Sequence, residues 1–296
     1  MKKSTTIMLA VLVLLAAATY FVMQRPGEQS SAGPEKVLVD FDSAAVDRIE
    51  VRSSSGAVTL EKAGGEWMMT SPLRYKADNA SVTSALGSAR KILLSSLVSS
   101  NPQKQHLFLV DSTGTLVRLM DRDAERAAFR VGKMGPSYTE TYVRKEGSDD
   151  VYLTEGMIGP TFAKKPNDWR DKSIFKADQA SITSVAFRYG DTLFTVAFRD
   201  SAWTVNNVKA NSQTVTAFLS ALANLTADEF IDTTVAAMPK LSAQIELPGT
   251  QIRLYALGTT DRTYVQTSAS PQLFLVYNWR AQQLLKREKD FLAAAQ

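Results

Sequence analysis

The sequence contains no cysteine and only one histidine, His106. The absence of cysteine excludes disulfide bonds, thiolate metal sites, cysteine nucleophiles and lipid attachment through cysteine. A histidine-based zinc site needs at least two histidines, so the common hydrolytic zinc motifs are excluded as well. We therefore expect neither a metal nor a cofactor in this chain.

The chain also has only a small excess of charge of one sign. The net charge is +4, from 34 basic and 30 acidic residues, and the basic residues are spread along the chain. No run of lysine and arginine has the density of a nucleic-acid interface, so we expect no nucleic-acid partner. With 45% hydrophobic residues among 296, the chain has an ordinary globular composition, and its length suggests about two domains.

The sequence has one long apolar segment, at the N-terminus. Lys2 and Lys3 precede the uncharged stretch Thr5–Met23. A helix of about 19 residues is roughly 28 Å long, close to the thickness of the hydrocarbon layer of a bilayer. Because Lys2 and Lys3 outnumber Arg25, the positive-inside rule places the N-terminus in the cytoplasm. We predict that residues 1–24 are a single-pass signal anchor in a bacterial inner membrane, with the rest of the chain in the periplasm.

Cleavage of this segment is the alternative. Ala16–Ala18 offers a small-residue site, and removal after about Ala18 would release the rest of the chain. The apolar stretch continues past that site through residues 19–23, which favours an uncleaved anchor. Residues 25–36 are rich in Pro, Gly and Ser and have no periodicity, so they predict a flexible linker.

Two parts of the chain resemble each other. Segments starting at Ala44 and Ala180 match at a separation of 136 residues, and the helices that follow match at 133. The paired positions are Val46 with Ile182, Ile49 with Val185, Leu60 with Val196, Trp67 with Trp203, Val82 with Val215, and Leu86 with Leu219. We also align Val117–Leu119 with Ile252–Leu254, and the segment from Asp150 with the segment from Gln272. This self-similarity predicts two tandem copies of one unit, residues 37–175 and 176–296.

Both copies show the same order of elements. Each begins with two β-rich runs joined by a glycine-containing turn, then a short strand with a tryptophan, then a helix capped by Asp78 or Asn211. The predicted strands include Val46–Arg52, Val58–Lys62, His106–Val110, Leu116–Met120, Ala128–Val131, Thr141–Lys145, Val151–Thr154, Ile182–Tyr189 and Leu193–Arg199. Each copy ends in a helical segment. Strands joined by short turns predict antiparallel sheets, so the fold class is α+β.

The segment Lys164–Phe175 concentrates residue types that are used in catalysis. Arg170 and Lys172 are candidate anion binders, and Asp168 or Asp171 is a candidate base. The same segment is equally consistent with a structural joint.

A similar pattern closes the second copy, which favours the joint. Arg287–Lys289 repeats the charged pattern, and we pair Phe291 or Leu292 with Ile174 or Phe175. An active site is not expected to recur in degraded form at the end of each unit, whereas a repeat terminus is. We predict that Trp169 is packed at this joint and that a nearby acid holds its neighbour Arg170.

His106 and the tryptophans are weaker candidates. His106 would need an oriented partner to serve as a catalytic base, and nothing in the sequence orients the nearby Ser112 or Thr113. We interpret His106 as a strand residue. Trp67 and Trp203 are residue types that stack on sugars, but their equivalent positions favour core tryptophans.

The remaining candidates have ordinary structural interpretations. Gly64–Gly65 and Gly132–Gly135 do not stand between a strand and a helix as phosphate-binding glycines do, so we interpret them as loop residues. Asp111–Thr115 lacks the spaced acids of a calcium loop and predicts a hairpin turn. Asp149 and Asp150 lie in a predicted solvated turn. We assign no catalytic, cofactor-binding or metal-ligating residue.

Several segments resemble the bacterial DUF4340 family, whose name records an unassigned function. They are the apolar N-terminus with its linker, "VDRIEV" at Val46–Val51, "GEWMMTSPLRYKADNASV" at Gly65–Val82, "TYVRKEGSDDVYL" at Thr141–Leu153 and "NDWRDKSIF" at Asn167–Phe175. The resemblance covers most of Val37–Asp232. It implies a membrane-tethered extracytoplasmic subunit associated with ABC-type exporters, including those tied to gliding motility, and it carries over no catalytic residues.

These inferences lead to three functional hypotheses. The first is a non-catalytic accessory subunit that docks on an inner-membrane ABC-type permease and ATPase complex, or on another envelope protein. The second is an envelope ligand-binding or glycan-binding module, or an enzyme, that uses carboxylates and tryptophans. The third is a structural spacer in the periplasm without a specific partner.

Overall fold

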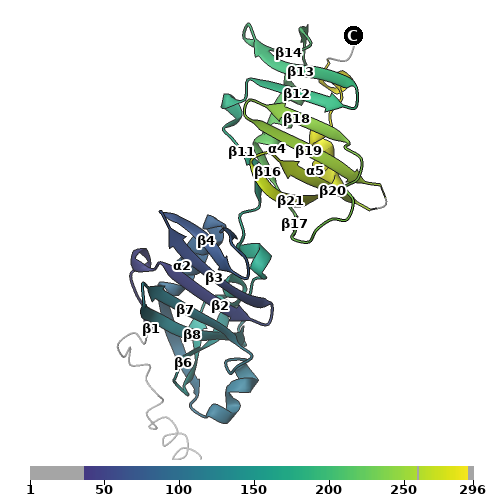
Figure 1. Ribbon diagram of the computed structural model, residues 1–296. Coiled ribbons are helices and arrows are strands. Elements are labelled where there is room, and N and C mark those ends of the chain that lie inside the picture. Colours follow the sequence, from purple (N-terminus) through teal and green to yellow (C-terminus); the bar gives the residue numbers. More distant parts are fainter. Residues whose placement is uncertain (1–36, 259, 293–296) are drawn as a thin grey trace, which may run out of the picture. The chain divides into compact units, whose positions relative to one another are not determined.

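The computed structural model of the chain describes residues 37–258 and 260–292 (Figure 1). The predicted anchor and linker, residues 1–24 and 25–36, lie outside these residues. No helix in the described part is long and apolar enough to cross a membrane. The described residues form two compact units: unit 1 contains 37–54 and 84–163, and unit 2 contains 55–83 and 164–292 without residue 259. The predicted boundary between residues 175 and 176 stays a prediction.

Unit 1 is built on an antiparallel sheet. Its strands, in hydrogen-bonded order, are β1 (Val37–Asp40), β6 (Lys91–Ser99), β10 (Val151–Glu155), β9 (Glu140–Lys145), β8 (Ala124–Met134), β7 (Thr115–Asp121) and β2 (Arg48–Ser53). The short helices are η1 (Ser43–Ala45), η2 (Pro102–Phe108) and α3 (Gly159–Phe162). Phe129 of β8 meets Phe162 of α3 edge to face, with ring centroids 5.9 Å apart, and both rings are buried. This aromatic contact therefore holds α3 against the sheet.

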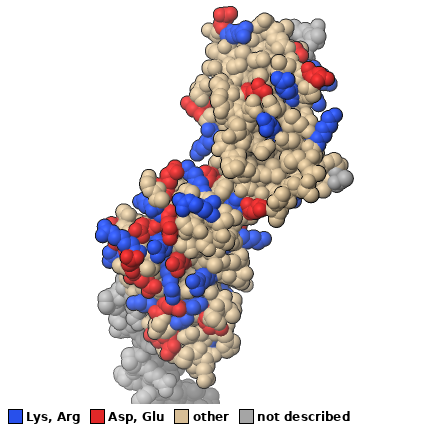
Figure 2. All heavy atoms as spheres, viewed as in Figure 1, with Lys and Arg blue, Asp and Glu red and all other residues tan. Residues whose placement is uncertain are grey.

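The outer face of unit 1 carries charges of both signs. Figure 2 shows basic and acidic side chains intermingled in the region where β2, β7 and β8 lie in Figure 1. Arg118 of β7 lies 3.6 Å from Glu125 of β8, and Arg130 of β8 donates to both carboxylate oxygens of Glu146 at 2.8 and 3.1 Å. The hydrogen bonds from Arg130 lower the pKa of Glu146. Because these basic and acidic side chains neutralise one another, this face has no electrostatic potential of a single sign.

Unit 2 contains a larger antiparallel sheet. Its strands, in order, are β15 (Val208–Lys209), β14 (Ala202–Val205), β13 (Thr192–Arg199), β12 (Ser184–Tyr189), β18 (Ala243–Leu247), β19 (Thr250–Leu257), β20 (Arg262–Thr267), β21 (Ser270–Tyr277) and β17 (Glu229–Ile231). β11 (Ser173–Lys176) pairs with β16 (Asn224–Thr226). The unit also contains the hydrogen-bonded series β3 (Gly56–Ala63), β4 (Glu66–Ser71) and β5 (Tyr75–Lys76).

Helices pack on one face of the large sheet and enclose the core of unit 2 (Figure 1). They are α4 (Ser212–Ala223), α5 (Asn278–Leu284) and α6 (Glu288–Phe291), and the 3-10 turns of the unit are η3 (Pro166–Trp169) and η4 (Gln179–Ser181). Phe187 stacks on Phe194 with ring centroids 4.7 Å apart, and it also packs against Phe218 of α4 and Phe291 of α6. α4 begins where the side chain of Asn211 accepts from Gln213 N and Thr214 N, the predicted cap.

The predicted class is confirmed in its general form, since the chain folds as antiparallel sheets with a few helices and is mainly β. The predicted strand His106–Val110 is wrong. Its first three residues lie in η2, whose first turn is capped by Asn101 and starts with Pro102, and Leu109 ends this helix in the left-handed conformation. Proline favours the first position of a helix, and it has no N–H group to donate a hydrogen bond to a neighbouring strand. The pair Asn101–Pro102 therefore indicates that a helix begins here. The first long helix, α2 (Asn79–Ala89), begins after the predicted cap, with Ser81 N donating to Asp78 Oδ1 at 2.7 Å.

Equivalent contacts recur at the predicted separations. Ala77 N donates to Trp67 O at 2.9 Å, and Ala210 N donates to Trp203 O at 2.8 Å. Asp78 N donates to Trp169 O at 2.8 Å, and Asn211 N donates to Phe291 O at 2.7 Å. Since 133 residues separate both Ala77 from Ala210 and Asp78 from Asn211, Phe291 corresponds to Trp169. Its predicted pairing with Ile174 or Phe175 is wrong.

A second predicted alignment is also wrong. Val117–Leu119 lies in β7, which pairs with β2, whereas Ile252–Leu254 lies in β19, which pairs with β18 and β20. The strand that pairs with β12 is β18. The predicted alignment therefore matched β7 with the strand after its true counterpart, β18. Alternating apolar residues occur in every strand of such a sheet, so a short apolar match does not identify which strand is equivalent.

Candidate functional site

The cluster from Trp169 to Lys172 begins at the end of η3. Trp169 and Arg170 are 0% and 1% exposed. Backbone bonds hold this segment against β5 and the residue after it: Arg170 forms a bridge with Ala77, and Asp171 N donates to Lys76 O at 2.9 Å. The segment is thus a backbone joint inside unit 2.

The guanidinium of Arg170 is enclosed on all sides. Its Nη1 donates to the two carboxylate oxygens of Asp232 at 3.0 and 2.8 Å, and its Nη2 donates to Gln272 Oε1 at 3.0 Å. Its Cζ lies 3.7 Å from the ring centroid of Phe230 and 4.3 Å from that of Tyr75. Burial in this cluster raises the pKa of Tyr75. A cation held between two rings and an acid is not available to a soluble anion.

The other charged residues of the cluster are used locally. Lys172 Nζ lies 3.0 Å from Asp168 Oδ1 in an exposed pair, and Asp171 Oδ1 accepts from Ser173 N at 2.9 Å. Both acids of the cluster, Asp168 and Asp171, are therefore engaged in local contacts and are not free to act as a base. The prediction that Trp169 is packed and that an acid holds Arg170 is confirmed, and the acid is Asp232.

The residues around His106 do not form a catalytic arrangement. His106 is exposed in η2. Asp111 Oδ1 accepts from Thr113 Oγ1 at 2.6 Å and from Thr113 N at 3.1 Å, and these bonds lower the pKa of Asp111. This turn joins η2 to β7 and is not a hairpin turn, which corrects the prediction for Asp111–Thr115. Within the described residues, no group of three or more His, Asp or Glu side chains could hold a metal ion.

The glycine and acid pairs have structural roles. Gly64–Gly65 forms the turn between β3 and β4, as predicted. Gly132 lies inside β8 and not in a loop, and a side chain there would collide with the carbonyl oxygen of Phe108. Asp149 and Asp150 lie between β9 and β10, in the predicted turn.

The two matched tryptophans differ in exposure. Trp67 in β4 is buried, as a core tryptophan should be. Trp203 in β14 is only partly buried, and its ring lies 5.4 Å from the ring of Phe198, centroid to centroid. Phe198 lies on the same face of β13 as Phe194 but is 48% exposed. The core interpretation holds for Trp67 and only in part for Trp203.

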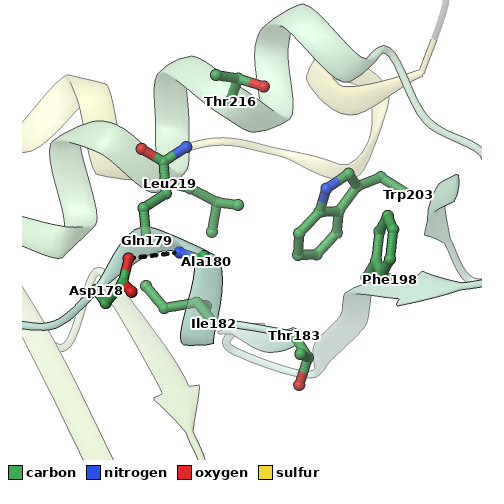
Figure 3. A pocket seen from close by; sticks show the side chains of 9 residues that line it. All are labelled: Asp178, Gln179, Ala180, Ile182, Thr183, Phe198, Trp203, Thr216 and Leu219. Carbon is green, nitrogen blue, oxygen red and sulfur yellow. Dashed lines mark hydrogen bonds between the residues drawn. The ribbon is translucent and has the colours of Figure 1, made fainter. Parts of the chain in front are cut away.

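Trp203 and Phe198 line a pocket of about 450 Å³ in unit 2 (Figure 3). The aromatic pair forms one side, and Gln179 and Ile182 lie across from it, with Thr216 of α4 above. The lining residues are Asp178, Gln179, Ala180, Ile182, Thr183, Phe198, Trp203, Thr216 and Leu219. One hydrogen bond is drawn among these nine, from Ala180 N to Asp178 Oδ1 at 3.0 Å. The sequence patterns singled out Trp203 but not Phe198. The exposure of Phe198 depends on which residues pack against the end of β13, and the sequence alone does not show these.

Comparison with known proteins places the chain in one family. Residues 67–244, more than half of the chain, match the family described as "Domain of unknown function (DUF4340)". The chain belongs to this family, as its sequence motifs predicted. No curated protein and no solved structure matches the chain.

Proposed function

We propose that this chain is a non-catalytic accessory subunit that a single N-terminal helix holds at the bacterial inner membrane. In this proposal its body lies in the periplasm, consists of two tandem copies of one α+β unit, and docks on an ABC-type permease and ATPase complex. The observation that carries the docking role is an uncovered strand edge in unit 1.

That edge belongs to β6. β1 covers only the start of this strand, where Val37 pairs with Leu93 and Asp40 pairs with Lys91. On the other side, β10 pairs with β6 as far as Ser99. From Leu94 onward, no strand among the described residues pairs with the β1 side of β6. Among residues 37–258 and 260–292, no strand covers the backbone amide and carbonyl groups on that side, and in our proposal they pair with an incoming strand.

The chemistry of this edge suits a protein partner. Leu94–Ser99 has the sequence "LSSLVS", without charge or proline, and Leu97 is 51% exposed. Natural edge strands are usually protected by lysine, proline or a covering segment. An edge that lacks lysine and proline can accept an extended segment by strand addition, with an exposed leucine as an apolar contact.

The roles of the charged side chains within residues 37–258 and 260–292 support the non-catalytic part of the proposal. The acids that the sequence singled out form ion pairs or accept hydrogen bonds in turns and at caps. Arg170 is held in an ion pair with Asp232. Hydrolysis or group transfer needs converging groups with perturbed protonation. The described residues offer instead a folded body with an accessible strand edge.

The experiment is affinity capture of the tagged full chain from its native host after gentle detergent solubilisation. We expect mass spectrometry to find permease and ATPase subunits in stoichiometric amounts. Leu97→Lys should abolish their recovery by placing a charge on the edge. Leu107→Lys is the matched control, because Leu107 is equally exposed at 50% in the same unit but lies on η2.

Two results would contradict the proposal. Recovery of the protein alone at native expression levels would remove the ABC-type partner. Equal recovery of partners by Leu97→Lys and wild type would remove β6 as the docking edge. The membrane part has its own test: the intact mass of the isolated protein distinguishes a retained helix from cleavage after about Ala18.

A further inference from the structure

We propose that the pocket lined by Trp203 and Phe198 binds a neutral sugar ring of a glycan. This inference goes beyond the docking role and does not depend on it, because the pocket lies in unit 2 and the β6 edge lies in unit 1. The pocket holds about 450 Å³, within the roughly 300–1,000 Å³ range of small-molecule sites.

One side of the pocket offers an aromatic surface. The rings of Trp203 and Phe198 are tilted by 56° and form a corner that faces the cavity (Figure 3). Exposed aromatic rings in a concave site mark recognition more often than stability, since the same rings would be better buried. A pyranose has an apolar C–H face of matching size that packs on such a ring.

The rest of the lining includes polar groups suited to hydroxyls. Gln179 lies across from the aromatic pair, Thr216 lies above it and Thr183 lies below it, beside Phe198, and no hydrogen bond is drawn from these three side chains to the other lining residues (Figure 3). An amide and two hydroxyls provide both donors and acceptors at short range. A leucine or phenylalanine side chain of a protein partner would leave these groups unpaired, whereas sugar hydroxyls would satisfy them.

The charge of the lining favours a neutral ligand. No lysine or arginine is among the nine lining residues, and the one ionisable side chain is Asp178. Its Oδ1 accepts from Ala180 N, which leaves the other carboxylate oxygen to accept from a hydroxyl. A phosphorylated or acidic sugar would meet this carboxylate without a cation to compensate.

The corresponding positions of the first copy lack this aromatic corner. At the separation of 136 residues, Lys62 stands where Phe198 stands, and Trp67 is buried where Trp203 is partly exposed. The strands that both copies share can therefore form without an exposed Phe–Trp pair. Phe198→Lys consequently substitutes a residue that the chain itself uses at the corresponding position.

The test is a titration of the full chain in a zwitterionic detergent, because sugar-headed detergents would occupy the site. The probes are three neutral trisaccharides, maltotriose, cellotriose and N,N′,N″-triacetylchitotriose, with a galacturonate trimer as the acidic comparison. We expect at least one neutral probe to shift tryptophan emission with saturation below about 10 mM, the weak end of ligand affinities. Trp203→Ala and Phe198→Lys should each weaken binding roughly tenfold or more.

Trp279→Ala is the matched control, because Trp279 is also exposed but lies on α5, outside the pocket. It should leave the affinity unchanged, and the melting temperature of Phe198→Lys should stay near wild type because Phe198 is half exposed. The proposal is overturned if no neutral probe saturates, or if binding persists in Trp203→Ala and Phe198→Lys. It is also overturned if only an apolar peptide binds and Phe198→Lys abolishes that binding.

Discussion

Arg170 and Asp232 form a two-point ion pair across 62 positions of sequence, with Nη1 at 3.0 and 2.8 Å from the two carboxylate oxygens. The two partners differ in environment, since the side chain of Arg170 is 0% exposed and that of Asp232 is 37% exposed. The buried cation therefore depends on the acid more than the acid depends on the cation.

Arg170→Ala should lower the free energy of unfolding by about 3–5 kcal/mol, because it removes a buried, ring-packed partner. The measurement is urea denaturation followed by tryptophan fluorescence. Lys172→Ala is the matched control, since its ion pair with Asp168 is exposed and worth about 1 kcal/mol or less. Equal losses for the two variants would show that Arg170 is not a structural centre.

Trp169→Ala should lower the free energy of unfolding by about 3–5 kcal/mol, the usual loss for a buried aromatic side chain. Trp169→Phe should lower it by less than about 1.5 kcal/mol. The indole Nε1 of Trp169 has no hydrogen-bond partner among the described residues, and Phe291 occupies the corresponding position. Thermal melting of both variants checks this. If Trp169→Ala melts like wild type and instead loses partner capture, Trp169 belongs to a functional site.

Gly132→Ala should destabilise unit 1 by about 1–3 kcal/mol, because its Cβ would press on the backbone of η2 and on Val110 Cγ1. Gly87→Ala is the contrasting variant. Gly87 lies in α2, and the space that a β-carbon would take there is open, so alanine should raise stability by roughly 1 kcal/mol. Calorimetric unfolding of the two variants should therefore show shifts of opposite sign.

Tyr189 should make stability depend on alkaline pH. Burial raises the pKa of Tyr189 from 10.0 to about 12, and its Oη donates to Lys286 O at 2.7 Å. The folded state therefore holds the phenol proton more tightly than the unfolded chain. This contribution is complete below pH 10 and is lost as pH rises toward 12. The free energy of unfolding of Tyr189→Phe should fall less steeply over that interval. Parallel curves for the two proteins would contradict the shift.

Local chemistry allowed much of the fold to be predicted. Asp78 and Asn211 cap their helices as expected because a cap depends only on the next three residues. The strands that flank glycine turns were also found from alternation. His106 was misassigned because "HLFLV" has the composition of a strand, although Pro102 upstream already favoured a helical start.

The candidate sites were less predictable, because they depend on which distant residues meet. An acid for Arg170 was expected, but 30 acidic residues compete for that role in the sequence. Asp232 was selected by the arrangement of β17 beside η3, which no local pattern encodes. Trp67 and Trp203 look alike in sequence, and their different exposure is decided by neighbours such as Phe198.

Each compact unit is assembled from separate stretches of chain, since residues 55–83 belong to unit 2 while the flanking stretches belong to unit 1. During synthesis, Tyr75 therefore leaves the ribosome long before its partner Phe230, and the two rings end 5.3 Å apart. Unit 2 therefore cannot be completed until residues 164–292 follow its first stretch, whereas the described residues of unit 1 are all made before residue 164. A fragment limited to residues 176–296 would lack Tyr75 and Arg170, so we expect unit 2 to mature only when residues 55–83 are present on the same chain.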